Sequence, residues 1–245
     1  VERKGNYAGG RTTRLLVRED RKLIIDRSQR VLLIVNSLAA HGDQQLKRLY
    51  AYTEKAGVAV AKKYLAGSYS WIEVLRDQEA TRASFLGSLE KLVADPRVEA
   101  LDLFLQVHGE PAKVCFYDQW LATGRLSEEI QAVTKGRCLR LVYNTSCYGD
   151  SHSDHLLQSG FRVAIGSRLI NANAATEYPL FCRYWQDRSS KGNHYQSVDE
   201  IIKRVDRAGF RVIQDWIASI KFKKVDSKKM IRGDRQIHIA SAPRP

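Results

Sequence analysis

Long apolar runs and paired cysteines are both missing from this 245-residue sequence. No stretch approaches the roughly 20 continuous apolar residues that a membrane helix requires, so we expect no membrane span. The four cysteines, Cys115, Cys138, Cys147 and Cys182, form no CxxC pair. This spacing argues against a secreted disulfide scaffold and against a cysteine-rich zinc module. We therefore expect a soluble protein whose thiols are free.

Signals for targeting and for nucleotide binding are also missing. Nothing near Val1 has the charged, apolar and small-residue order of a signal peptide. Because the chain begins with Val1 and not with Met, an upstream targeting peptide stays an open alternative to the cytoplasmic location that we expect. No glycine-rich loop that could cradle a phosphate occurs, so we expect neither a nucleotide nor any other cofactor.

The formal net charge of +13 lies almost entirely at the two ends of the chain. Residues 1–30 carry nine Lys/Arg against four acids, and residues 221–245 carry eight against two, whereas the residues between them carry 23 against 21. We divide the chain into a basic N-terminal segment, 1–29, and one domain, 30–245, that ends in a basic segment, 221–245. The basic ends predict a solvated surface; contact with nucleic acid, anionic lipid or an acidic partner is the alternative, and nucleic acid is not an expected partner.

Apolar runs alternate with helical patterns along the whole chain. Strands are predicted at 30–37, 71–75, 100–110, 113–118, 138–144 and 160–167. Helices are predicted at 43–57, 80–95, 125–133, 150–158, 172–186 and 196–208. In the first helix Leu46, Leu49, Tyr50 and Tyr52 form the expected apolar face before Gly57, and Ser127 is a candidate cap of the third.

This alternation predicts an α/β fold with a mostly parallel central sheet and helices on both faces. The functional crevice of such a sheet lies beyond the carboxyl ends of its strands. His108 and Cys147 each fall within three residues of a predicted strand end. If those two strands are neighbours, about 5 Å apart, the two side chains can reach each other.

A thiol and an imidazole in this arrangement predict nucleophilic catalysis. The ordinary pKa of a cysteine, near 8.5, requires a base or a cationic neighbour before the thiol becomes an effective nucleophile at neutral pH. His108 is the candidate base, and the N–H groups of Gly109 and Cys147 are candidate donors to a developing oxyanion. The alternatives are a buried structural histidine, an inert thiol and a turn glycine.

The two blocks LDLFLQVHG and LRLVYNTSCYG, in this order, resemble the caspase-like (clan CD) cysteine peptidases. WIEVLRDQEATRASFLGSLEKLVADP resembles the second strand and helix of that fold, and the resemblance covers roughly residues 30–210. It implies a caspase-hemoglobinase-like fold and a cysteine endopeptidase that acts through a Cys/His dyad and a thioacyl-enzyme. It further implies His108 as general base, Cys147 as nucleophile, an oxyanion hole of the Gly109 and Cys147 amides, and a protein or peptide substrate, with an activating protein as a further partner.

Two features of the sequence depart from true caspases. The pentapeptide Q-A-C-[RQG]-G is replaced by Thr145-Ser146-Cys147-Tyr148-Gly149, and His108 precedes Cys147 by 39 residues where about 50 is typical of caspases. The shorter spacing and the Ser-Cys junction look closer to bacterial CHAT-domain, legumain-like and clostripain-like relatives. The segment AIGSRLINANAATEYPLF also resembles the CHAT segment that follows the fifth strand.

Charged residues near the predicted strand ends are candidates for a substrate pocket. Arg168 could receive an acidic substrate side chain, whereas Asp150, Glu110 or Glu177 could receive a basic one. The sequence does not decide between them. The alternative is that these side chains are merely solvated at loop ends.

A zinc site is an alternative use of the same residues. Cys147, His152, Asp154 and His155 form C-x4-H-x-D-H, which could hold zinc, but no second cysteine pair completes a closed site, so no metal is expected. We expect His152 and His155 at a turn or on the solvent-facing side of their short helix. The alternative function is a noncatalytic caspase-like binding module that contacts an acidic partner or nucleic acid through its basic ends.

Overall fold

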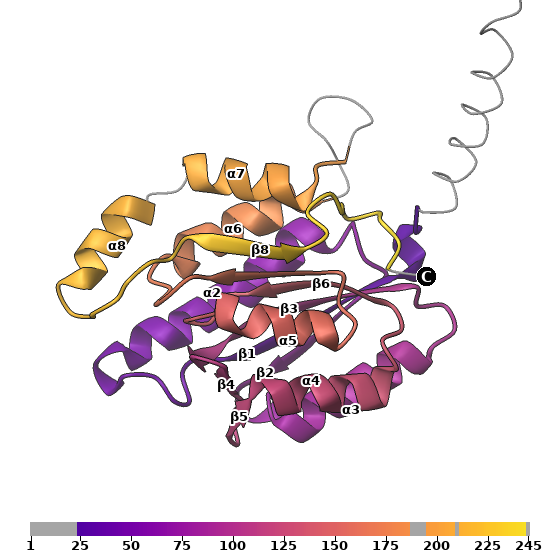
Figure 1. Ribbon diagram of the computed structural model, residues 1–245, viewed down its shortest axis with the longest axis horizontal. Helices are drawn as coiled ribbons and strands as arrows, with labels where there is room; N and C mark the ends of the chain where they lie inside the picture. The colour runs from indigo at the N-terminus through magenta and orange to yellow at the C-terminus, as the bar shows by residue number, and fades with distance from the viewer. Residues whose placement is uncertain (1–23, 187–194, 209–210, 244–245) are drawn as a thin grey trace, which may run out of the picture.

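The computed structural model describes residues 24–186, 195–208 and 211–243. A central sheet is covered by helices on both faces (Figure 1), which confirms the predicted α/β class. The strands are β1 (Arg30–Ser37), β2 (Trp71–Arg76), β3 (Ala100–Glu110), β4 (Lys113–Cys115), β5 (Trp120–Ala122), β6 (Leu139–Asn144), β7 (Val163–Ser167) and β8 (Lys229–Gly233). The helices are α2 (Lys47–Leu65), α3 (Arg82–Ala94), α4 (Thr123–Thr134), α5 (Asp150–Gln158), α6 (Ala174–Tyr184), α7 (Val198–Ala208) and α8 (Arg211–Ser219).

The order of the strands places the predicted site strands side by side. The sheet runs β2-β1-β3-β6-β7-β8, with β1, β2, β3, β6 and β7 parallel and β8 antiparallel to β7. The short hairpin of β4 and β5 extends the end of β3. β3 pairs with β6 over a register in which Leu105 lies opposite Asn144. The carboxyl ends of these two strands therefore meet at one edge of the sheet.

The apolar sequence of β1 is explained by the burial of both of its faces. All eight of its residues are buried, because successive side chains point to opposite faces and each face is covered. Val31 and Leu33 belong to the core with α3, α4 and α5, whereas Leu32 and Ile34 belong to the core with α2, α6 and α7. Figure 1 shows the same two layers of helices on either side of the sheet.

Helix α2 differs from its prediction in both length and orientation. It does not weaken at Gly57 but continues to Leu65, and Leu49 and Tyr52 of the expected apolar face are exposed. A Cβ atom at position 57 would lie 2.6 Å from Oε1 of Gln106. The glycine thus lets the helix approach β3 closely, and the close approach decides which face is buried.

The cap proposed at Ser127 is wrong. Helix α4 starts at Thr123, after Ala122 as the N-cap residue, which makes no side-chain cap bond. Ser127 lies inside the helix and is buried, and its hydroxyl donates to the carbonyl of His155 at 2.6 Å. The side chain therefore joins α4 to α5 and does not begin a helix.

The basic C-terminal segment 221–245 contributes a strand to the sheet. Lys229 of β8 lies opposite Ser167 of β7, and neither β8 nor α8 was predicted. The N–H of Ile25 donates to the carbonyl of Ala240, so the two ends of the described chain meet. Most of the basic N-terminal segment 1–29, residues 1–23, lies outside the described residues. In the described ranges no helix has the length and hydrophobicity to cross a membrane.

Candidate functional site

His108 lies within β3, two residues before the strand ends at Glu110. The strand continues to Glu110 because β4 folds back on it, with Cys115 opposite His108. The Nε2 atom of His108 lies 2.6 Å from the carbonyl oxygen of Leu38. Since a carbonyl oxygen only accepts, Nε2 must carry the proton. Nδ1 of the neutral ring is thereby left with a lone pair that can accept one.

The loop before α2 closes over this ring. The aromatic ring of Tyr50 meets the His108 imidazole edge to face, with ring centroids 5.0 Å apart. A Cβ atom at position 42 would lie 2.2 Å from the Tyr50 ring and 3.0 Å from Nε2 of His108. Gly42 is therefore needed for the loop to pack against both rings, and this packing holds the imidazole in one orientation.

Cys147 follows β6 by three residues, as expected, in a loop held by its neighbours. The hydroxyl of Ser167 donates to the carbonyl of Ser146 at 2.9 Å. Asn171 contacts the loop twice, since its side chain donates to the carbonyl of Thr145 at 2.7 Å and its backbone N–H lies 3.5 Å from Sγ of Cys147. These contacts come from β7 and the segment after it, so the thiol is positioned by the neighbouring strand.

Gly109 brings the two strand ends into direct contact. A Cβ atom at this position would lie 2.4 Å from the carbonyl oxygen of Cys147 and 2.9 Å from the side chain of Ser146. Only a residue without a side chain fits there. The chain segment that carries His108 is thus packed against the segment that carries Cys147.

Burial sets the protonation of both groups. It lowers the pKa of His108, an effect that the hydrogen bond to Leu38 partly offsets. It raises the pKa of the Cys147 thiol, against the opposing effects of the Asn171 N–H and the Lys229 ammonium. Near neutral pH the thiol and the imidazole are therefore both uncharged.

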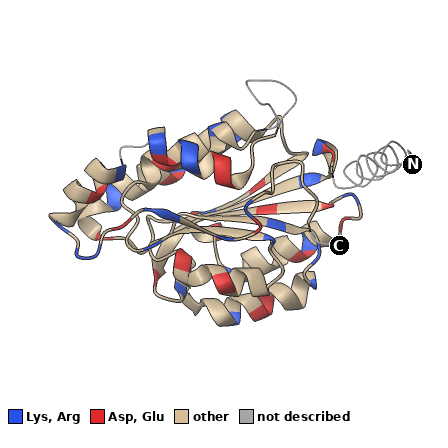
Figure 2. Ribbon diagram, turned by 45° about the horizontal axis from the view of Figure 1, so that its top comes forward, with Lys and Arg blue, Asp and Glu red and all other residues tan. Residues whose placement is uncertain are grey.

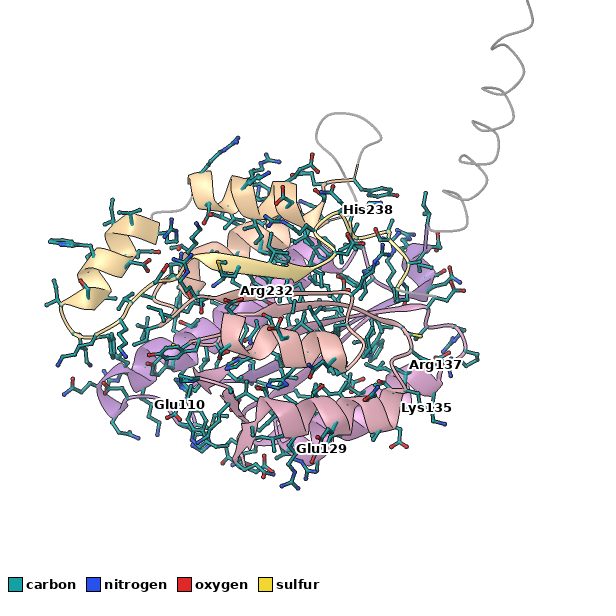
Figure 3. All side chains as sticks on the ribbon, in the orientation of Figure 1. Glu110, Glu129, Lys135, Arg137, Arg232 and His238 are labelled. Carbon is teal, nitrogen blue, oxygen red and sulfur yellow. The ribbon has the colours of Figure 1, made fainter. Side chains whose placement is uncertain are left out.

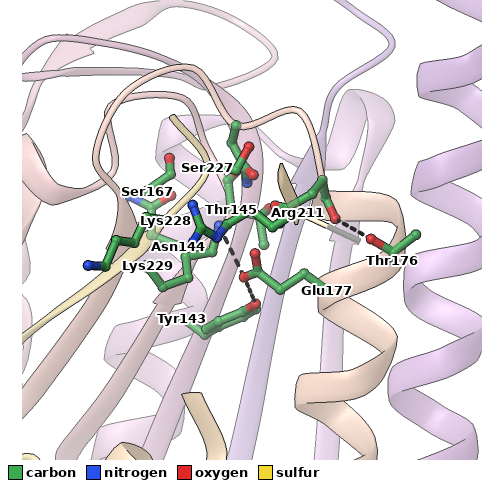
Figure 4. A network of polar contacts seen from close by, with 12 residues as sticks. Tyr143, Asn144, Thr145, Ser167, Thr176, Glu177, Arg211, Ser227, Lys228 and Lys229 are labelled. Carbon is green, nitrogen blue, oxygen red and sulfur yellow. Dashed lines mark hydrogen bonds and ion pairs between the residues drawn. The ribbon is translucent and has the colours of Figure 1, made fainter. Parts of the chain in front are cut away.

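Lys229 and Glu177 form a buried ion pair (Figure 4). Nζ of Lys229 lies 3.1 Å from the carboxylate of Glu177, which also accepts a hydrogen bond of 2.5 Å from the hydroxyl of Tyr143. Burial raises the pKa of Glu177. Because its carboxylate is paired in the interior, this candidate pocket residue is not presented to solvent.

His152 is not solvent-facing, which corrects that expectation. It is fully buried, with Nε2 at 2.8 Å from the carbonyl of Glu110 and Nδ1 at 3.0 Å from the side-chain nitrogen of Asn144. Asn144 in turn accepts from the N–H of Ser146 at 2.9 Å. Both ring nitrogens are engaged, so His152 supports the two strand ends and has no free lone pair for zinc.

The other pocket candidates lie at the surface. Asp150 is paired with Arg232 of β8 at 2.9 Å, and Arg168 is paired with Asp226 at 3.2 Å. Glu110 is exposed at the end of β3 (Figure 3). Among the described residues, no salt bridge involves its carboxylate.

The three remaining cysteines are unsuited to nucleophilic chemistry, although Cys138 is only partly buried. Cys115 and Cys182 are fully buried. Burial raises the pKa of Cys115 to about 12 and also raises those of Cys138 and Cys182. Their thiolates are therefore scarce at neutral pH.

Several residues of the site were missed at the level of the sequence. Leu38 takes part through its backbone, which no side-chain pattern reveals. Tyr50 was expected in the core, Lys229 in a solvated tail, and Asn171 had no assigned role. The AIGSRLINANAATEYPLF resemblance was the one signal that pointed at the segment containing Asn171.

Comparison with known structures shows what this arrangement is similar to. The crystal structure of the Drosophila initiator caspase Dronc matches with a TM-score of 0.55 at 13% identity, over 89% of this chain and 86% of that one. Caspase-1 from Spodoptera frugiperda matches with a TM-score of 0.56 at 12% identity, over 89% and 92%. The chain has a caspase-like fold.

Sequence comparison adds no closer relative. The sequence matches no protein-family model and no curated protein. At 12–13% identity the likeness concerns the caspase-like fold alone. A fold does not determine a function, which depends on the residues of the site.

Proposed function

We propose that this protein is a cysteine endopeptidase in which His108 and Cys147 form the catalytic dyad. The observation that carries the proposal is the fixed tautomer of His108. The hydrogen bond to Leu38 keeps the proton on Nε2, and Cys147 follows the neighbouring strand β6 by three residues. Nδ1 is then the base that accepts the thiol proton.

The reaction follows from these two groups. As Nδ1 of His108 takes the proton, Sγ of Cys147 attacks the peptide carbonyl carbon and a C–S bond forms. The N–H groups of Gly109 and Cys147 donate to the resulting oxyanion. His108 then passes its proton to the leaving amine as the C–N bond breaks, and water hydrolyses the thioacyl-enzyme. An uncharged thiol and an uncharged imidazole suit this series of steps, because proton transfer to His108 accompanies the attack by Sγ.

The charged residues near the proposed site would give it one of two substrate specificities. Side chains two residues apart on a strand point to the same side, so Glu110 shares the side of His108 and could receive a basic substrate side chain, as could Asp150. Arg168 is half exposed and could receive an acidic one.

A closer relation to bacterial CHAT, legumain-like and clostripain-like peptidases is part of the same proposal, supported by the 39-residue spacing and the Ser146-Cys147 junction.

A noncatalytic binding module is the second candidate. The burial of Cys147, which raises the pKa of its thiol, favours it, because a buried cysteine is ordinarily inert. In that case an acidic protein or a nucleic acid would contact the basic ends of the chain.

Cleavage of a peptide library by the protein and by its Cys147→Ala variant separates these candidates. The peptidase predicts cleavage by the wild type only, and the preferred residue identifies the pocket. Cleavage after basic residues supports Glu110 or Asp150, and cleavage after acidic residues supports Arg168. An uncut library, or one cut equally by both proteins, would contradict the proposal.

Gly109→Ala should lower kcat at least about 10²-fold, because the added methyl group displaces the Cys147 loop and a shift of about 1 Å can cost that much. The overlap with the Cys147 carbonyl supports this expectation. Steady-state kinetics on the best library peptide measure it. Gly87→Ala is the matched control, since a Cβ atom there meets no atom within 4 Å and kcat should not change. Equal activity of both variants would argue against a role for this contact.

A further inference from the structure

Helix α8 is attached to the body of the protein by its polar side. Gln214 accepts a hydrogen bond of 2.9 Å from the hydroxyl of Thr176 in α6. Asp215 accepts from both the N–H and the hydroxyl of Ser227, at 3.1 and 2.5 Å. Polar contacts of this kind are usual on the outer side of a surface helix. Here they face inward.

The apolar side of α8 faces outward. The exposed residues recur at positions i, i+1, i+4, i+5 and i+8, which form one stripe of a helix. They are Val212, Ile213, Trp216, Ile217 and Ile220, each between 55% and 78% exposed. None of the residues of α8 is buried. In Figure 1 the helix stands at the margin of the molecule, beyond the start of β8.

Positive charge lies at the end of this stripe. Residues 220–228 contain four lysines and one acid, Asp226. Lys221 fastens the turn to the body through Asp43, at 2.8 Å. Lys223, Lys224 and Lys228 are exposed, and the turn that follows α8 is coloured blue at the left of Figure 2.

We propose that α8 and the turn after it form a docking site for an anionic lipid bilayer, with the apolar stripe inserted at the interface and the lysines against the headgroups. An interfacial helix combines such a stripe, often with tryptophan, and adjacent lysines. Trp216 lies within the stripe, and tryptophan favours the membrane interface. The helix lies on the bilayer and does not span it.

Other occupants fit the same surface less well. A second copy of the chain, packed stripe to stripe with parallel helices, would bring two lysine-rich turns together, and like charges repel. In the antiparallel arrangement the lysines would face a stripe that contains no acidic side chain. A peptide helix docks into an apolar groove, whereas α8 protrudes with no buried residue. A bilayer requires no groove and attracts the lysines, so it satisfies both the shape and the charge.

Co-sedimentation with vesicles tests the docking proposal without any peptidase assay. The outcome is therefore independent of the proposed activity. The full chain should sediment with vesicles of phosphatidylcholine and phosphatidylserine, weakly with phosphatidylcholine alone, and less in high salt. Trp216→Ala should weaken partitioning at least about tenfold. Lys223→Ala with Lys224→Ala should weaken it about 25-fold, or about fivefold for each charge.

Trp71→Ala is the matched control, because Trp71 is also exposed but lies at the start of edge strand β2. It should bind vesicles like the wild type. Brominated lipids should quench tryptophan fluorescence in the Trp71→Ala variant and much less in Trp216→Ala. The proposal is overturned if wild type and Trp216→Ala bind vesicles equally, if Trp216→Ala instead dissociates a dimer in sedimentation velocity, or if the lysines bind nucleic acid and no vesicles.

Discussion

Replacing His108 with alanine should lower kcat for peptide cleavage by about 10²- to 10⁴-fold, the range that a positioned general base supplies. The burial of Cys147 makes the loss large, because its raised pKa leaves little thiolate without help from a base. Steady-state kinetics on a library-derived peptide measure the effect. His155→Ala is the matched control, since its ring lies on α5 and contacts Gln158, and it should retain wild-type kcat.

The pH profile separates a base from a merely structural histidine. Burial lowers the pKa of His108, so the neutral, active form is fully present above the ordinary value of about 6.5 and is lost as pH falls through the lowered pKa. Alkylation of Cys147 should therefore persist into mildly acidic buffer in the wild type. In His108→Ala it should rise only with the thiol's own ionisation, above about pH 8.5. Identical profiles would contradict the dyad.

Replacing Arg140 with methionine should lower the free energy of unfolding by about 3–5 kcal/mol, the range for breaking a buried ion pair. Arg140 of β6 and Asp102 of β3 are fully buried and 2.7 Å apart. Asp102 also accepts hydrogen bonds from Tyr69, at 2.5 Å, and from Trp185, at 3.2 Å. Without the guanidinium, a carboxylate is left uncompensated in the interior. Urea denaturation measures the change.

Two further variants test the cause of that loss. Arg140→Met combined with Asp102→Asn removes both charges and keeps an acceptor for Tyr69, so it should recover at least half of the lost stability. Arg97→Met breaks an ion pair with Asp95 in which the arginine side chain is 83% exposed, and it should leave the urea midpoint unchanged. An Arg140→Met variant as stable as the wild type would show that the pair does not join β3 to β6 energetically.

Membrane docking would place the chemistry of the candidate site near a surface. The turn after α8 is fastened to Asp43, and the loop that contains Asp43 also supplies Gly42 and leads to Tyr50, which pack on the His108 ring. The proposed lipid site and the proposed catalytic site therefore share one supporting loop. Substrates brought to the same bilayer would meet the proposed catalytic site at a raised local concentration.

The strands that carry the site could be predicted because their pattern is local. The run 30–37 became β1 with the same limits, and 100–110 became β3 with the same limits. A strand buried on both faces has no alternative to a continuous apolar sequence. The alternation of strands and helices implied a parallel sheet with both residues near strand ends, but that the two strands are neighbours was shown only by the pairing of β3 with β6.

The sequence-based expectations that proved wrong concerned burial, which depends on contacts between distant residues. Leu49 and Tyr52 were expected in the core, but the approach of Gly57 to Gln106 turned them outward. Lys229 was assigned to a solvated tail, but its pairing opposite Ser167 and its ion pair with Glu177 buried it. His152 was expected at the surface, but both of its ring nitrogens found partners inside.

Hydrophobic periodicity and residue type along one stretch of chain were enough to predict the α/β class, the strands that end near His108 and Cys147, and the glycine next to the histidine. The tautomer of His108, the burial of Cys147 and the outward apolar face of α8 could be known only from the folded chain. Each of these depends on a partner far away in the sequence: the carbonyl of Leu38, the backbone of Asn171, and the hydroxyls of Thr176 and Ser227. Hydrogen bonds and burial of this kind exist only after the chain has folded.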